Sequence, residues 1–156
     1  METGRVRTPC VGMCSTTYGD LVCRGCRRFA HEIVAWNGYG DAEKRAVLRR
    51  LRTLRDQVVT GRLEVVDEAL LDAQLERRRI PHDPEDTAPT RAYLLLRRGA
   101  RHMRRLDAYG LRARPGFEAL SCVDLRDRID LDFQALSEAH YERYFAPKVA
   151  PASAAS

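Results

Sequence analysis

The chain has 156 residues, of which 44% are hydrophobic and 31% are charged, a composition typical of a globular protein with one core or one core and a satellite module. No apolar run approaches the roughly 18 residues that a membrane span needs, and the first residues lack the apolar segment of a secretory signal. We therefore expect a cytoplasmic protein that binds no membrane and keeps its cysteines reduced.

The formal net charge is +5 and its placement is uneven. Residues 1–60 hold 11 Arg and Lys against 6 Asp and Glu, whereas residues 61–156 hold equal numbers of each. A basic half favours nucleic acid or an acidic protein surface as partner. The plainer interpretation is an arginine-rich solvated surface.

The first half of the chain predicts three helices. A short helix follows the cysteines, with Phe29, Ile33 and Trp36 on one face. Asp41 is a good N-cap for a second helix up to Val59, after which Gly61 interrupts the pattern. The core stripe of that helix consists of Val47, Leu51, Leu54 and Val58. Asp67 caps a third helix, which should end by Pro81 and bury Leu70, Leu71 and Leu75.

The second half predicts a linker and more helix. Residues 81–90 contain three prolines and three acidic residues, which is typical of a linker. Residues 91–110 should form one helix and residues 117–145 another, in one or two pieces, with a loop between them. No strand alternation appears. We expect an all-α protein: a metal-binding module over residues 1–60, a small helical bundle over 61–147, and a disordered tail over 148–156.

Four cysteines within seventeen positions form the pattern C-x3-C-x8-C-x2-C: Cys10, Cys14, Cys23 and Cys26. Two close pairs joined by a short loop can converge on one metal ion. Gly12 and Gly25 lie inside the pairs, where glycine lets the backbone turn closely beneath a metal. The sequence therefore predicts a four-cysteine metal site rather than buried or disulfide-bonded thiols.

Two metals suit this site. All-sulfur ligation is typical of both zinc and iron–sulfur clusters, but the cysteine runs of ferredoxins are absent, and the spacing favours Zn²⁺. A helix that starts at the last ligand favours thiolate there. Arg24, Arg27 and Arg28 are placed to offset the charge of −2 that a zinc tetrathiolate carries, or to contact nucleic acid or an acidic partner.

The segment "PCVGMCSTTYGDLVCRGCRRFAHEIVAW" resembles a bacterial domain-of-unknown-function family (number 1289) of small four-cysteine proteins, commonly labelled predicted Fe-S protein. The residues that carry the resemblance are Pro9, Cys10, Cys14, Cys23, Gly25, Cys26, Arg28, Glu32, Ile33 and Trp36. The resemblance covers about residues 8–50 and implies a four-cysteine metal site. It implies no established reaction.

Other residues offer weaker candidates. Cys122 lies on an apolar helix face and should be packing, and His31 is an alternative ligand on the helix after Cys26. No phosphate loop, nucleophile elbow or zinc-protease motif is present. The sequence therefore favours a protein without enzyme activity, and the third possibility, an enzyme with its active site in the helical body, has no motif behind it.

We expect a structural metal site that orders a basic interaction module, in which Arg45, Arg49 and Arg52 form a face that meets nucleic acid or an acidic protein. The alternative is an iron–sulfur protein that carries electrons or senses redox state.

Overall fold

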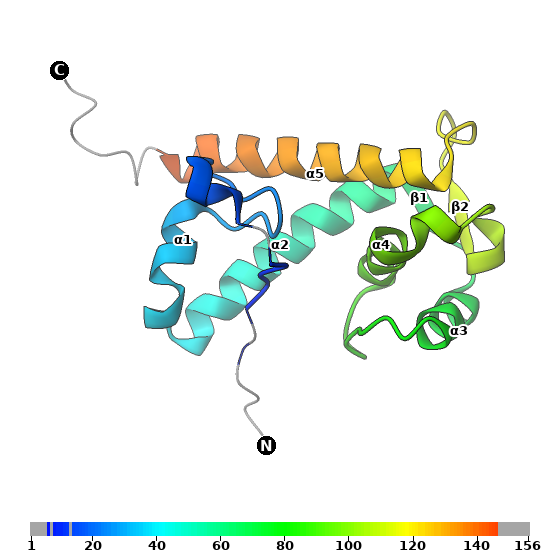
Figure 1. The fold of residues 1–156 in the computed structure, drawn as a ribbon, viewed down its shortest axis with the longest axis horizontal. Coiled ribbons are helices and arrows are strands. Elements are labelled where there is room, and N and C mark those ends of the chain that lie inside the picture. The colour runs from blue at the N-terminus through cyan, green and yellow to red at the C-terminus, as the bar shows by residue number, and fades with distance from the viewer. Residues whose placement is uncertain (1–5, 7, 13, 147–156) are drawn as a thin grey trace. The chain divides into compact units, whose positions relative to one another are not determined.

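The computed structural model describes residues 6, 8–12 and 14–146 (Figure 1). In this part the chain is mostly helical, with five α-helices and one two-stranded sheet. The helical class is therefore confirmed, whereas the predicted tail over 148–156 lies outside the described residues. No helix in the described part is both long and apolar enough to cross a membrane.

The chain divides into two compact units. The N-terminal unit comprises residues 1–53 together with 134–156, and the central unit comprises residues 54–133. This division differs from the predicted domains 1–60 and 61–147, because the end of the last helix packs with the N-terminal segment. The predicted linker over 81–90 lies inside the central unit.

The N-terminal unit contains α1 (Ala30–Ala35), the first part of α2 (Asp41–Arg62) and the last part of α5 (Cys122–Tyr144). Short 3-10 helices cover Ser15–Tyr18 and Trp36–Gly38. Two small groups of buried side chains hold this unit together. One consists of Val22, Phe29 and Tyr141, and the other of Trp36, Val47 and Leu51.

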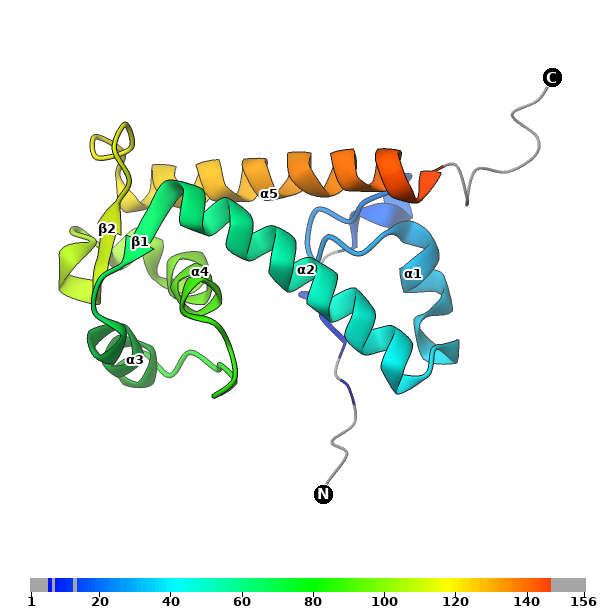
Figure 2. The same cartoon turned by 180° about the vertical axis from the view of Figure 1, so that it is seen from behind.

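The central unit contains α3 (Glu68–Arg77) and α4 (Ala88–Gly99), with short 3-10 helices over Ala100–His102 and Asp107–Tyr109. Strands β1 (Leu63–Val65) and β2 (Leu111–Ala113) lie side by side in Figures 1 and 2. They pair antiparallel, with Leu63 opposite Ala113 and Val65 opposite Leu111.

Side-chain caps fix where the helices of the central unit begin. The Asp67 carboxylate accepts the backbone N–H of Leu70 at 3.0 Å, as the sequence predicts. The Thr87 hydroxyl caps α4 by accepting the N–H of Thr90 at 3.2 Å. Both threonine hydroxyls also donate to the Asp56 carboxylate, at 2.6 and 2.7 Å, so the start of α4 is tied to α2.

Three sequence-based expectations about the elements were wrong. The strands were missed, α2 continues through Gly61 to Arg62, and the helix predicted over 91–110 ends at Gly99. Gly99 weakens the end of α4, because glycine disfavours the helical conformation, and the chain then turns toward Gly110.

Gly110 lies where two backbone segments approach closely. It has a φ of 77°, and a Cβ there would lie 2.2 Å from the carbonyl oxygen of Asp67. The close approach lets the Gly110 carbonyl accept the N–H groups of Val66 and Asp67 next to the sheet.

Candidate metal centre

The second cysteine pair lies in a tight turn of the N-terminal unit. The N–H of Cys23 donates to the carbonyl of Arg28 at 2.9 Å, and the N–H of Arg27 donates to the carbonyl of Cys23 at 2.8 Å. Val22 and Phe29 form an antiparallel bridge just outside the turn. Arg27 has a φ of 63°, a left-handed conformation that costs a non-glycine residue about 1–2 kcal/mol. The local contacts of the turn therefore hold a conformation that an isolated chain disfavours.

Backbone N–H groups surround the sulfur of Cys23. The N–H of Gly25 lies 3.4 Å from Sγ, and those of Cys26 and Ser15 also donate to it. Burial raises the pKa of the Cys23 thiol, but these N–H groups, together with a hydrogen bond from the Cys26 side chain, outweigh burial and lower the pKa to about 7. Cys23 is 1% exposed. The turn thus stabilises a buried thiolate, the form of cysteine that binds metals.

Cys26 lies next to a buried guanidinium. Burial raises the pKa of the Cys26 thiol, and Arg28 opposes that rise. The Nε of Arg28 donates to Cys26 Sγ at 3.3 Å, and the Arg28 guanidinium carbon lies 4.8 Å from the centroid of the Trp36 ring. A positive charge that is only 4% exposed is stabilised by a negative partner. Cys26 would supply that partner once its sulfur loses the proton, as it does when a cysteine binds a metal.

The first cysteine pair approaches this turn through Ser15. The hydroxyl of Ser15 accepts the N–H of Arg24 at 2.8 Å, and the Ser15 N–H donates to the Cys23 sulfur. Cys14, the preceding residue, is half-buried, and its sulfur lies 2.9 Å from the Thr16 hydroxyl oxygen. Cys14 is therefore the sequence neighbour of Ser15, whose backbone N–H donates to the Cys23 sulfur.

Cys10 is exposed, and its surroundings repeat one feature of Cys23. The N–H of Gly12 lies 3.4 Å from Cys10 Sγ, the same spacing in sequence and the same distance as between Gly25 and Cys23. Gly12 has a φ of 88°, which favours glycine at this position. In both pairs, the glycine inside the pair donates its N–H to the sulfur of the first cysteine.

The four cysteines do not converge in this structure. Across residues 6, 8–12 and 14–146, no three His, Cys, Asp or Glu side chains are grouped closely enough to hold a metal ion. The predicted metal knuckle is therefore not shown, and metal binding stays a prediction. The residues present nevertheless fit a soft metal, since each pair offers thiols with N–H donors directed at sulfur.

A buried ion pair connects α1 to α2 beside this centre. Both Glu32 carboxylate oxygens accept hydrogen bonds from the Arg50 guanidinium, each at 2.6 Å. Glu32 Oε1 also accepts the N–H of Phe29 at 2.8 Å, at the start of α1. The Arg50 guanidinium carbon lies 3.9 Å from the centroid of the Phe29 ring. Glu32 thus fixes the helix that begins four residues after Cys26.

The arginines predicted as partner contacts divide into two groups. Arg27 and Arg28 are 5% and 4% exposed, so they cannot form part of a contact surface. Arg24 is exposed and forms an ion pair with Asp20 at 3.3 Å. Arg45 and Arg49 are exposed and Arg52 is half-buried; no ion pair involving these three is found among the described residues.

The structure places His31 near aromatic rings of the N-terminal unit and Cys122 outside that unit. The His31 ring lies 5.9 Å from that of Phe29 and 6.5 Å from that of Tyr141, measured between centroids. Cys122 is buried at the start of α5 in the central unit, and burial raises its pKa. Ser15 and Arg50, by contrast, were missed by the sequence analysis, since a serine in a loop and one arginine among many carry no distinguishing pattern.

Comparison with known proteins supports the resemblance of the cysteine segment. A family model described as "Protein of unknown function (DUF1289)" matches residues 8–55, which include all four clustered cysteines and the first part of α2. Comparison with curated proteins and with solved structures gave no match.

Proposed function

We propose that this chain, whose residues 8–55 match a family of uncharacterised proteins, is a metal-binding protein in which Cys10, Cys14, Cys23 and Cys26 hold one metal ion or cluster. The site stabilises the N-terminal unit, which in turn presents a basic surface to a nucleic acid or an acidic protein. Segments shorter than about 40 residues seldom fold alone without a metal or disulfide, and residues 8–40, which contain all four clustered cysteines, are a segment of that size.

One observation carries the proposal: both cysteine pairs form the same N–H to sulfur contact. The contact recurs at 3.4 Å in each pair, from Gly12 to Cys10 and from Gly25 to Cys23. N–H groups directed at sulfur stabilise thiolate and tune a metal bound to it. An ordinary buried thiol needs no such donor, and a repeated one fits two halves of a single site.

Zinc is the metal we favour. Cys23 and Cys26 lie on a tight turn with two residues between them, and four thiolates satisfy the tetrahedral preference of Zn²⁺. The alternative, an iron–sulfur protein in electron transfer or redox sensing, draws support from the Arg28 contact to Cys26 sulfur, since hydrogen bonds to sulfur tune a cluster's reduction potential.

The arginines of the N-terminal unit have two different roles in this proposal. Some offset the negative charge of the metal site, and others contact the partner. A four-thiolate zinc site carries a charge of about −2, which the two buried arginines beside it, Arg27 and Arg28, can offset. Arg45, Arg49 and Arg52 follow one another at four-residue and three-residue spacing, so they lie on one side of α2. These three, with Arg24, make up the proposed contact surface.

Metal analysis of protein purified without oxygen tests the proposal. We expect a colourless protein with one zinc per chain. Ser at any of the four clustered cysteines should lower the metal content, whereas Cys122→Ser, the matched control, should keep it. A brown protein with iron and sulfide would establish the cluster instead, and a metal-free protein with intact helices would refute both.

A further inference from the structure

Ser15 connects the two cysteine pairs of the N-terminal unit. It directly follows Cys14 of the first pair, and its hydroxyl accepts the backbone N–H of Arg24 at 2.8 Å. Arg24 lies between Cys23 and Cys26, inside the second pair. The backbone N–H of Ser15 also donates to the Cys23 sulfur. A residue of the first pair's segment therefore contacts the second pair through two separate groups.

The turn of the second pair is held by its own backbone. The N–H of Cys23 donates to the carbonyl of Arg28 at 2.9 Å, and the N–H of Arg27 donates to the carbonyl of Cys23 at 2.8 Å. The Cys26 side chain also forms a hydrogen bond with the Cys23 sulfur. None of these groups belongs to the segment of the first pair. The two sulfurs of the second pair are therefore brought together without help from the first.

The first pair is more accessible and makes different contacts. Cys10 is exposed and Cys14 is half-buried, whereas Cys23 is 1% exposed. The Cys10 sulfur accepts the N–H of Gly12, and the Cys14 sulfur lies beside the Thr16 hydroxyl. In the part of the chain that the structure describes, the hydrogen bonds of these two sulfurs stay within their own segment. The Ser15 contacts therefore join the two pairs where the thiols of the first pair do not.

We propose that Ser15 is a positioning residue that acts as a latch: it holds the first cysteine pair at the second and so sets the rate at which bound metal leaves. This inference rests on the proposed metal site. Opening the first pair breaks the contacts of Ser15 with Arg24 and Cys23, whereas the turn around Cys23 and Cys26 keeps its own backbone bonds. Metal is therefore released on the side of Cys10 and Cys14.

The rate of zinc release from the full, zinc-loaded chain tests the proposal. An excess of 4-(2-pyridylazo)resorcinol, a chelator whose absorption changes when it binds zinc, measures that rate. Ser15→Ala removes the hydroxyl but keeps the N–H, and we expect zinc to leave about fivefold faster, the effect of one hydrogen bond. Ser15→Thr, which keeps the hydroxyl, should restore the unmodified rate to within about twofold. Thr17→Ala, at an exposed position of the same loop, should do the same.

Proline at position 15 tests the second contact. Ser15 is the first residue of a 3-10 helix, where proline is tolerated, and Cys14 has the extended conformation that suits a residue before proline. Ser15→Pro removes both the hydroxyl and the N–H that donates to the Cys23 sulfur. Zinc should therefore leave faster from Ser15→Pro than from Ser15→Ala. Should the proline variant not fold, the alanine and threonine variants decide.

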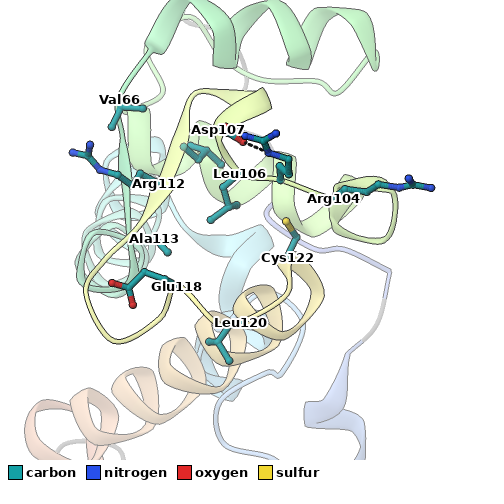
Figure 3. Close-up of a pocket in the computed structure, with 11 residues that line it drawn as sticks. Val66, Arg104, Leu106, Asp107, Arg112, Ala113, Glu118, Leu120 and Cys122 are labelled. Carbon is teal, nitrogen blue, oxygen red and sulfur yellow. Dashed lines mark hydrogen bonds and ion pairs between the residues drawn. The ribbon is translucent and has the colours of Figure 1, made fainter.

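Alkylation read out residue by residue distinguishes a latch from a general loss of structure. Figure 3 shows Cys122 in the central unit, where it is 5% exposed and serves as an internal control. In zinc-loaded Ser15→Ala, iodoacetamide should label Cys10 and Cys14 faster than in the unmodified protein and before Cys23. The rate at Cys122 should stay unchanged, because the latch does not act on the central unit.

Two results overturn the proposal and leave the metal site standing. One is a zinc-loaded Ser15→Ala variant that releases zinc at the unmodified rate. The other is labelling that accelerates at Cys122 as much as at Cys10 and Cys14, which indicates general unfolding. A chain that binds no metal overturns the proposed function, and this inference with it.

Discussion

The Arg28 guanidinium joins the Cys26 sulfur to the Trp36 ring: its Nε lies 3.3 Å from Sγ, and its central carbon lies 4.8 Å from the ring centroid. All three side chains belong to the N-terminal unit. A change at the sulfur therefore changes the electrostatic surroundings of the indole through one side chain.

Trp36 should report on the metal site. It is the chain's single tryptophan and is 6% exposed. Removing the metal with a chelator should release Arg28 from the ring and shift the emission of Trp36 to longer wavelength. In Arg28→Gln the shift should be much smaller, whereas Arg24→Gln should behave like the unmodified protein. Equal shifts in all three would show that Arg28 does not couple the two groups.

The ion pair between Glu32 and Arg50 should be a main support of the N-terminal unit. Arg50→Gln leaves the Glu32 carboxylate, whose side chain is 4% exposed, buried without its cation, and we expect a loss of about 3 kcal/mol in the free energy of unfolding. Arg49→Gln, at the exposed neighbouring position, should cost less than about 0.5 kcal/mol. Urea unfolding of the metal-loaded protein, followed by Trp36 emission, measures both.

A second substitution shows whether the loss of stability comes from the buried, unpaired Glu32 carboxylate. Adding Glu32→Gln to Arg50→Gln removes the buried charge, so the double variant should be more stable than Arg50→Gln alone. If Arg50→Gln and Arg49→Gln unfold at the same urea concentration, the pair contributes nothing measurable and the interpretation fails.

Gly110 should be required by the fold of the central unit. An alanine Cβ there would lie 2.2 Å from a backbone oxygen, so Gly110→Ala should destabilise by about 3 kcal/mol or more. Gly116 also has a positive φ but has nothing within 4 Å of an added Cβ. Gly116→Ala should therefore cost only the backbone strain, about 1 kcal/mol. Guanidinium unfolding followed by circular dichroism compares them, and equal losses would show that the clash relaxes.

The basic face of α2 should bind nucleic acid through phosphates. Replacing Arg45, Arg49 and Arg52 by Gln should weaken binding of a fluorescein-labelled RNA and lower the salt dependence of its affinity by up to about 3 in log–log slope. The control replaces Arg77, Arg98 and Arg101 in the central unit. Unaltered RNA affinity, combined with loss of captured proteins in pull-downs, would identify an acidic protein as the partner. No change in either measurement would refute the interaction role.

The sequence predicted the parts of the fold that depend on local patterns. The stripe of Val47, Leu51, Leu54 and Val58 is buried, and Asp67 caps α3. Local patterns could not show the sheet, because each strand has three residues and the partners Glu64 and Arg112 are 48 positions apart. Apolar residues continue at helical spacing past Gly99 in the sequence, which is why a helix was predicted up to residue 110, but α4 ends at Gly99.

The candidate site was predictable only in part for the same reason. The cysteine spacing and the glycines inside the pairs indicate the turns, and both glycines donate to sulfur. The pairing of Glu32 with Arg50 joins residues 18 positions apart among many arginines, so no pattern distinguishes it. Exposure of Arg27 and Arg28 could not be read from their charge, because it depends on the turn that surrounds them.

X-ray absorption of the metal in protein purified without oxygen tests the central claim, a zinc ion held by four cysteines, most directly. We predict a zinc edge with a first shell of four sulfur atoms at about 2.3 Å, and one sulfur fewer in Cys10→Ser, the variant of the most exposed ligand. A first shell dominated by nitrogen or oxygen, or a four-sulfur shell unchanged in Cys10→Ser, would contradict the proposed site.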